Sequence, residues 1–176
     1  MNMAQISLWL AALARLARHR WRGRSVHRAL PPDALQRITA RIAASERRHT
    51  GQIRICVEGG LPWSYIARHA SARDRAVMMF SKLRVWDTEH NNGVLIYLLI
   101  AERSIDIVAD RGLHAHVGSG EWRQLVSGMA SAFRAERFEE GLTVAVDAVG
   151  ALLERHFPAT EDAPRTNELP DAPHVL

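Results

Sequence analysis

Cysteine and lysine are almost missing from this chain of 176 residues, since Cys56 is its only cysteine and Lys82 its only lysine. A single cysteine excludes an internal disulfide and a zinc site built on cysteines, and it fits a reducing compartment. One lysine, at a helix position expected to be exposed, leaves no evident Schiff-base residue. We expect Cys56 to be a packed strand residue rather than a nucleophile, because free cysteines are commonly buried.

Long apolar runs are also lacking. No stretch approaches the ~20 apolar residues that a membrane-spanning helix needs. The short apolar stretch at residues 6–16 has no positive charge before it and is followed by arginines, which opposes export and predicts a cytoplasmic location. The GxxxxGK[ST] phosphate loop and the GxSxG nucleophile elbow are absent. The common enzyme signatures therefore give no lead.

Positive charge is gathered at the beginning of the chain. Residues 1–50 hold ten arginines against Asp33 and Glu46, a net charge of +8, while the other 126 residues hold 13 basic and 17 acidic groups, a net charge of −4. A basic arm on a mildly acidic domain indicates an anionic partner, either lipid headgroups or nucleic acid. The strands lack the aromatics of RNA-binding sheets and no helix-turn-helix follows the arm, so we expect no specific nucleic acid.

The arm, residues 1–30, has the pattern of an amphipathic helix. Its apolar residues recur at spacings of three and four, and its arginines fall largely on the other side. An apolar face with Trp9 beside a cationic face is typical of a helix lying in a membrane interface. Two alternatives remain open, because mixed faces are common on soluble helices. The arm is then either a helix that docks on its own domain or a frayed extension.

Residues 31–157 have the pattern of one α/β domain. Pro31-Pro32 breaks the chain, and Asp33 is expected to cap a helix that runs to about Arg48. A strand follows at 52–58, then a loop, then a helix from a cap at Ser71 to Leu83, with Val77 and Phe80 facing the core. A central strand at 93–100 is apolar apart from a tyrosine. It continues through a hairpin into an antiparallel strand at 105–109.

Two helices, at about 121–137 and 139–156, complete the domain, and a tail at 158–176 follows. The tail holds four of the seven prolines and a net charge of −3, so we expect it to be extended and loosely held. The element order predicts an α/β fold, a small three-layer αβα sandwich around a short mixed sheet, with the basic N-terminal helix and the extended tail appended.

The hairpin geometry suggests one site. The strand at 105–109 returns to the end at which the strand at 93–100 begins, so the side chains of four residues become neighbours, while Glu58 faces away: Asp87, Asn91, Asn92 and Asp110. Two carboxylates and two amides offer hard oxygen ligands for calcium or magnesium. His90, His114 and His116 lie nearby and suit a softer metal. The alternative is that these residues only form turns and cap the next segment.

Two stretches carry a resemblance to a known family. They are WDTEHNNGVLIYLLIAERSIDIVADRG and EWRQLVSGMASAFRAERFEEGL, followed by ERHFP. Over roughly Arg47 to Pro158 the chain resembles the TPM domain family, which includes thylakoid lumen proteins of photosystem II repair and many bacterial envelope proteins. The resemblance implies an αβ sandwich with an acidic pocket for a divalent cation, usually calcium, and weak acid phosphatase activity in some members.

Position by position, the resemblance puts Asp87 at the aspartate of the loop before the central strand, Asn92 at the asparagine before Gly93, and Asp110 at the polar strand end. The chain departs from the family pattern by lacking an evident export signal or C-terminal anchor. It also has Asp110-Arg111-Gly112 where many members have two glycines. It looks most like a short proteobacterial branch found beside membrane-linked and LemA-type proteins, which implies an accessory role at the cytoplasmic face.

The sequence therefore predicts a TPM-type accessory or binding domain with a divalent-cation pocket. We expect its arm to tether it to the inner membrane or to a membrane protein, with a LemA-type protein as one such partner. The alternative is a weak metal-assisted acid phosphatase, in which the cation polarises a phosphoryl oxygen and lowers the pKa of bound water.

Overall fold

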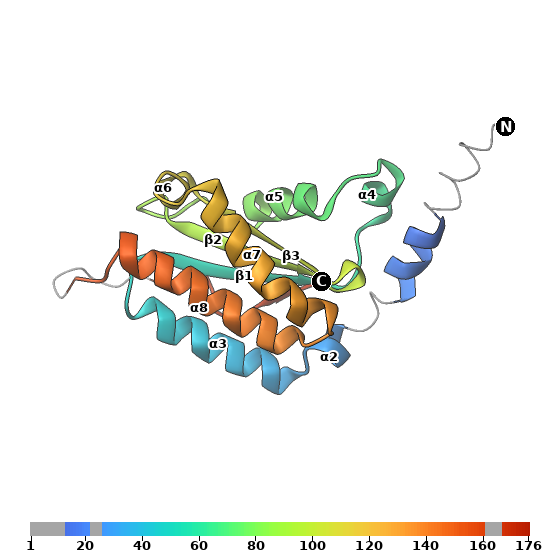
Figure 1. The fold of residues 1–176 in the computed structure, drawn as a ribbon, viewed down its shortest axis with the longest axis horizontal. Coiled ribbons are helices and arrows are strands. Elements are labelled where there is room, and N and C mark those ends of the chain that lie inside the picture. Colours follow the sequence, from blue (N-terminus) through green and yellow to red (C-terminus); the bar gives the residue numbers. More distant parts are fainter. Residues whose placement is uncertain (1–12, 22–25, 161–166) are drawn as a thin grey trace.

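A four-stranded mixed sheet forms the centre of the molecule in this computed structural model, which describes residues 13–21, 26–160 and 167–176 (Figure 1). The strand order is β3-β2-β1-β4. β1 (Gln52–Glu58) pairs in parallel with β2 (Gly93–Leu99), and β2 pairs antiparallel with β3 (Ser104–Ala109). β1 and β2 are buried along their whole length, as expected for central strands covered on both faces.

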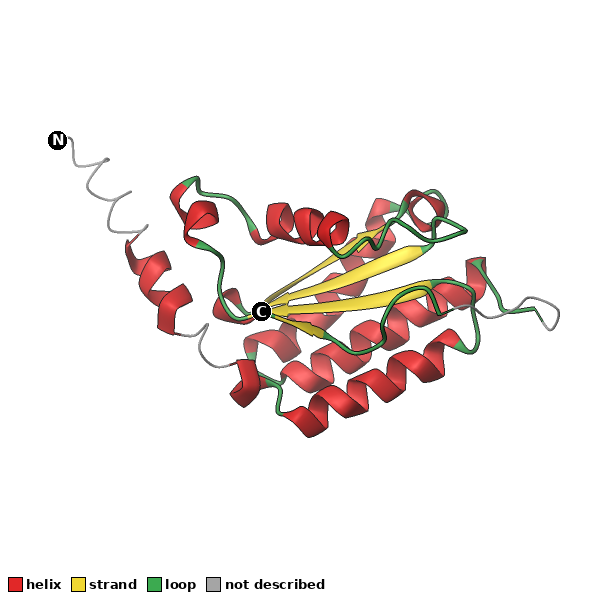
Figure 2. Ribbon diagram, turned by 180° about the vertical axis from the view of Figure 1, so that it is seen from behind, coloured by secondary structure: helices red, strands yellow, loops and turns green. Residues whose placement is uncertain are grey.

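Helices cover both faces of this sheet, so the predicted α/β sandwich is confirmed (Figure 2). On one face, Ile53, Ile55 and Val57 of β1 pack with three long helices: α3 (Pro32–Glu46), α7 (Ser119–Arg134) and α8 (Phe138–His156). On the other face, Cys56 of β1 and Tyr97 of β2 pack with α4 (Trp63–Ala67) and α5 (Ala72–Lys82). Shorter elements are α2 (Val26–Ala29), α6 (Arg111–His114) and the 3-10 turn Ile100–Glu102.

Several local predictions are confirmed. Ser71 caps α5 in a reciprocal arrangement with Asp74, each side chain accepting from the other's backbone N–H. The hairpin from β2 to β3 turns through Arg103 in the left-handed region at φ 51°. Cys56 is fully buried, and this burial raises the pKa of its thiol to about 12, which keeps it protonated near neutral pH. Both observations fit a packed strand residue.

Other local predictions are wrong. Asp33 does not cap α3, because the helix already begins at Pro32 with Pro31 as its cap, and proline is preorganised for the first helical position. Val77 is exposed and does not face the core, because α5 turns Ala72, Ala76 and Met79 inward instead. α4 lies between the predicted loop and α5, in a stretch for which the sequence predicts no element.

Residues 13–21 of the basic arm form a helix that lies against the domain. Arg15 donates to the carboxylate of Glu102 at 3.0 Å and to the carbonyl oxygen of Ala70 at 2.8 Å. His19 is buried, with Nδ1 accepting from the backbone N–H of Leu61 and Nε2 at 3.0 Å from Glu102. This part of the arm therefore docks on its own domain. The amphipathic prediction for residues 1–12 lies outside the described residues. None of the helices among the described residues combines the length and the apolar character that a membrane span requires.

The tail contradicts the expectation that it is loosely held. Its residues 167–176 run along the outer edge of β1, and β4 (His174–Val175) pairs in parallel with Cys56 and Val57. Leu169 is buried, and the buried guanidinium of Arg54 donates to two tail carbonyl oxygens. The prolines and charges of the tail give it a low intrinsic tendency to form a strand. Contacts with the edge of β1 outweigh that tendency, because strand formation depends strongly on tertiary context.

Candidate functional site

Three of the four predicted ligands gather at the edge of the sheet where β1 and β2 begin and β3 ends. The register pairs Gln52 with Gly93 and Val94 with Ala109, so the residues before β2 and after β3 are neighbours. The backbone N–H of Asp110 donates to the carbonyl oxygen of Gly93 at 2.9 Å, and that of Gly112 to the carbonyl oxygen of Asn91. We call this region, formed by Asn91, Asn92 and Asp110, the hairpin end. Glu58 lies at the opposite end of β1.

Asn92 is fully buried at the hairpin end. Its backbone N–H donates to Thr88 Oγ1 at 3.1 Å, and its side-chain Nδ2 donates to Thr50 Oγ1 at 3.3 Å. Its Oδ1 has no hydrogen-bond partner in the described part of the chain. A buried amide oxygen without a partner is uncommon, because its desolvation is not offset.

Asp110 is also buried, and it has features of both roles considered from the sequence, a metal ligand and a cap of the next segment. Its Oδ1 accepts from the backbone N–H of Arg111 at 2.7 Å, which makes it the cap of α6. Its Oδ2 is buried and finds no partner among residues 13–21, 26–160 and 167–176. One oxygen therefore caps the helix, and the other is buried without a hydrogen-bond partner in the described residues.

The other two predicted ligands are placed less favourably. Asn91 adopts φ 51°, a left-handed conformation that asparagine tolerates, and its Oδ1 accepts from the Arg111 guanidinium at 3.2 and 3.3 Å. A cationic side chain already occupies this oxygen. Asp87 is exposed in the preceding loop, where its backbone N–H donates to Arg84. Asn91 and Asp87 are therefore weaker ligand candidates than Asn92 and Asp110.

The three histidines do not form one metal centre. His114 is exposed at the end of α6, and His116 stacks on His156 with ring centroids 5.1 Å apart. His90 lies on the wall of a neighbouring cavity. Across the described residues, no three His, Cys, Asp or Glu side chains are grouped so that they could hold a metal ion. A cation here would need amide, carbonyl or water oxygens as further ligands.

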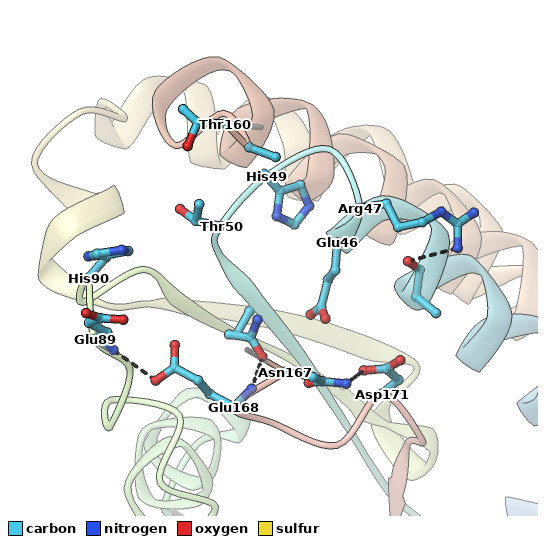
Figure 3. Close-up of a pocket in the computed structure, with 13 residues that line it drawn as sticks. Glu46, Arg47, His49, Thr50, Glu89, His90, Thr160, Asn167, Glu168 and Asp171 are labelled. Atoms are coloured by element: carbon cyan, nitrogen blue, oxygen red, sulfur yellow. Dashed lines mark hydrogen bonds between the residues drawn. The ribbon is translucent and has the colours of Figure 1, made fainter. Parts of the chain in front are cut away.

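A cavity of about 200 Å³ lies next to the hairpin end, between the last turn of α3, the start of β1, the loop before β2 and the tail (Figure 3). We call it the acidic pocket, because its walls carry four carboxyl groups and two imidazoles: Glu46, Glu89, Glu168, Asp171, His49 and His90. Sequence reasoning missed it, since no sequence pattern connects four segments that only the fold brings together.

Two groups of the acidic pocket, one buried and one partly buried, have displaced pKa values. Burial raises the pKa of Glu46 to about 8, and Asp171 adds to this, although a hydrogen bond from the Ile53 N–H favours the ionised form. Burial lowers the pKa of His49 to about 4. His49 is held between Ser45 Oγ and the carbonyl oxygen of Gly51, each at 3.0 Å from a ring nitrogen. Near neutral pH both groups are therefore uncharged in the folded protein.

The opposite end of β1 holds a buried charge network. Arg75 of α5 donates to both carboxylate oxygens of Glu58, at 2.6 and 2.7 Å, and the Tyr97 hydroxyl donates to Glu58 Oε2 at 2.7 Å. The Tyr65 ring lies 5.1 Å from the Arg75 guanidinium carbon. The hydrogen-bonding groups of Glu58, Arg75 and Tyr97 pair with one another. We therefore interpret this network as part of the fold and not as a ligand site.

Comparison with known proteins identifies the class. Residues 27–152 match the TPM domain, and the chain belongs to that family. Among solved structures it is similar to the NMR structure of the BA42 protein from the psychrophilic bacterium Bizionia argentinensis, with a TM-score of 0.72 and 25% sequence identity. That likeness covers 83% of this chain and 94% of the BA42 chain. No curated protein matches the chain. The family resemblance predicted from the sequence is thus confirmed.

Proposed function

We propose that this TPM domain binds a divalent cation, with calcium as the first choice, at the hairpin end through Asn92 and Asp110. The observation that carries the proposal is the pair of buried oxygens, Asn92 Oδ1 and Asp110 Oδ2, without described partners. A buried acceptor left unpaired costs about 1–3 kcal/mol. A hard cation would offset that cost, since carboxylate and amide oxygens are its preferred ligands. The residues present therefore fit such an ion.

The same geometry argues for a binding role rather than rapid catalysis. A metal-assisted hydrolase needs an open coordination position and a general acid or base within hydrogen-bond reach of the substrate. Here both oxygens are buried, and the buried imidazole of the adjacent pocket, His49, is bonded at both nitrogens. We infer that the domain acts as an accessory binding module, with weak phosphatase activity as the alternative.

Stabilisation by calcium tests the cation site. A ligand that binds only the folded state at 100 times its Kd adds about 2.7 kcal/mol, which appears as a higher Tm. Asp110→Asn should lose most of this increase while keeping the helix cap, because asparagine caps as well as aspartate. Asp171→Asn in the acidic pocket is the matched control and should keep it. If all three proteins respond alike, the hairpin end is not the site. If only the control loses the response, the acidic pocket is.

Turnover of a generic phosphomonoester separates the two functions. The binding role predicts a rate far below the usual enzyme range of about 1–10³ s⁻¹, with or without metal. A metal-dependent rate inside that range, abolished by Asp110→Asn, would establish the phosphatase instead.

We also propose that the arm tethers the domain to the cytoplasmic face of an anionic membrane or to a membrane protein. Arg15 and His19 face the domain, whereas Trp21 is 85% exposed and Leu13, Arg18 and Arg20 are exposed as well. An exposed tryptophan beside arginines suits the headgroup region of a membrane. The docked helix would then hold the domain against the surface rather than at the end of a free arm.

A further inference from the structure

The tail binds the domain mainly through its backbone. Gln52 Oε1 accepts from the successive backbone N–H groups of Glu168 and Leu169, at 2.9 and 3.0 Å. Arg54 Nη1 donates to the carbonyl oxygen of Pro170 at 2.6 Å and also to that of Ala172. Further along, β4 pairs with β1. Gln52, Arg54 and the strand edge therefore contact the backbone of an extended segment, and these contacts do not depend on its side chains.

Among residues 167–176, Leu169 is the one side chain buried in the core, and Val175 is partly buried against it. Leu169 is 6% exposed and packs with the cluster that includes Leu95 and Met79, whereas the neighbouring Glu168 and Pro170 are exposed. At the end of the chain, Leu176 exchanges backbone hydrogen bonds with the edge of β1, donating to Val57 and accepting from Gly59. Backbone pairing along a sheet edge plus one apolar anchor is the way in which domains bind peptides by strand addition.

The match to the family domain contains the strand that receives the tail but not the tail itself. The match to the family ends at residue 152, so it contains β1, β2 and β3 but not β4. Without the tail, β1 would be an open edge strand, which is a ready template for pairing with another chain. Gln52 and Arg54, buried at 4% and 8% exposure, would then lose these partners.

We propose that the outer edge of β1 is a peptide-binding groove and that residues 167–176 are its tethered occupant. The partner that it fits is an extended segment of another protein with a leucine-like side chain at the position of Leu169. A tethered segment competes at an effective concentration in the millimolar range, so a partner must displace it. Displacement would also remove Glu168 and Asp171 from the acidic pocket, which couples partner binding to the charge of that pocket.

Fluorescence anisotropy with a labelled peptide of residues 167–176 tests the proposal on the full chain. Leu169→Asp places a charge in the apolar site and weakens the chain's own tail while leaving the groove intact. We expect this variant to bind the peptide at least about tenfold more tightly than the wild type, because the internal competitor is weakened. Val144→Asp, at an exposed apolar residue of α8, is the matched control and should bind like the wild type.

A second peptide and a second variant complete the test. The peptide with aspartate in place of the leucine should bind none of the proteins, and Leu169→Ala should show a smaller gain than Leu169→Asp. Equal binding of the peptide by every protein, or by none, would overturn the proposal. So would the loss of a cooperative thermal transition in both Leu169 variants, since the tail would then be a part of the core that no partner can replace.

Discussion

The side-chain amide of Asn92 donates to Thr50 Oγ1 at 3.3 Å, and Thr50 is itself a wall of the acidic pocket. The proposed cation site at the hairpin end and the acidic pocket therefore share one polar contact. Thr50 is in turn held to the end of α8, where its backbone N–H donates to the carbonyl oxygen of Phe157 at 2.9 Å. Because hydrogen bonds fix the position of Thr50, we expect a change of charge in the acidic pocket to be felt at Asn92, and the reverse.

Glu46 should make the protein less stable as pH rises. Its folded-state pKa of about 8 lies above its ordinary value of 4.5, so between these values the folded state holds a proton that the unfolded state has lost. The free energy of unfolding should therefore fall across this window, by roughly 3–5 kcal/mol, and level off above it. Urea unfolding at a series of pH values measures the effect. Glu46→Gln, which cannot ionise, should remove this slope. An identical slope in both proteins would assign it to another group.

His49 should act in the opposite direction at lower pH. Its folded-state pKa of about 4 lies below the ordinary 6.5, so the unfolded state binds the proton first as pH falls. The stabilisation that comes from neutral His49 is fully present above pH 6.5 and should be lost as pH falls through 4, by about 3 kcal/mol in total. His49→Asn keeps a donor for the Gly51 carbonyl and should flatten this acid limb in the same unfolding series. A limb that persists unchanged would show that His49 is not its source.

Breaking the pair of Arg75 and Glu58 should be strongly destabilising. Arg75→Met leaves the buried carboxylate of Glu58 without its counterion. The free energy of unfolding should fall by roughly 3–5 kcal/mol, as when one partner of a buried ion pair is removed. Adding Glu58→Gln should recover part of the loss, because the uncompensated charge is removed. Chemical unfolding of both variants at neutral pH gives the comparison. A loss below about 1 kcal/mol in the single variant would match an exposed pair and contradict the burial.

Membrane binding should depend on the exposed side of the arm. The full chain should co-sediment with anionic vesicles at low salt and much less with neutral ones. Binding should weaken with salt because surface charges are screened beyond ~10 Å at 0.1 M. Trp21→Ala should reduce binding, whereas Trp86→Ala, at a tryptophan that is 51% exposed in the loop before β2, should not. Absence of binding to any vesicle would leave the arm as a docked structural helix only.

Part of the candidate site was predictable from the sequence. The hairpin from β2 to β3 followed from an apolar run, a turn and a second run. Its geometry predicted that the residues before β2 and after β3 are neighbours, and the backbone N–H of Asp110 does donate to the carbonyl oxygen of Gly93. Which oxygen remains free was not predictable. The oxygen of Asn91 accepts from Arg111, and one oxygen of Asp110 caps α6. Both contacts depend on local turn geometry, which residue types alone do not specify.

By itself the sequence determined the three long strands, the main helices and the family, because periodicity, capping residues and turn residues act over a few positions. Only the tertiary structure decided that the tail becomes a strand, that Arg15 and His19 dock the arm, and that an acidic pocket exists. These features rest on contacts between residues far apart in the chain, such as Arg54 with Pro170, 116 positions away. Their free energy comes from burial and from hydrogen-bond partners supplied by other segments, which no local pattern encodes.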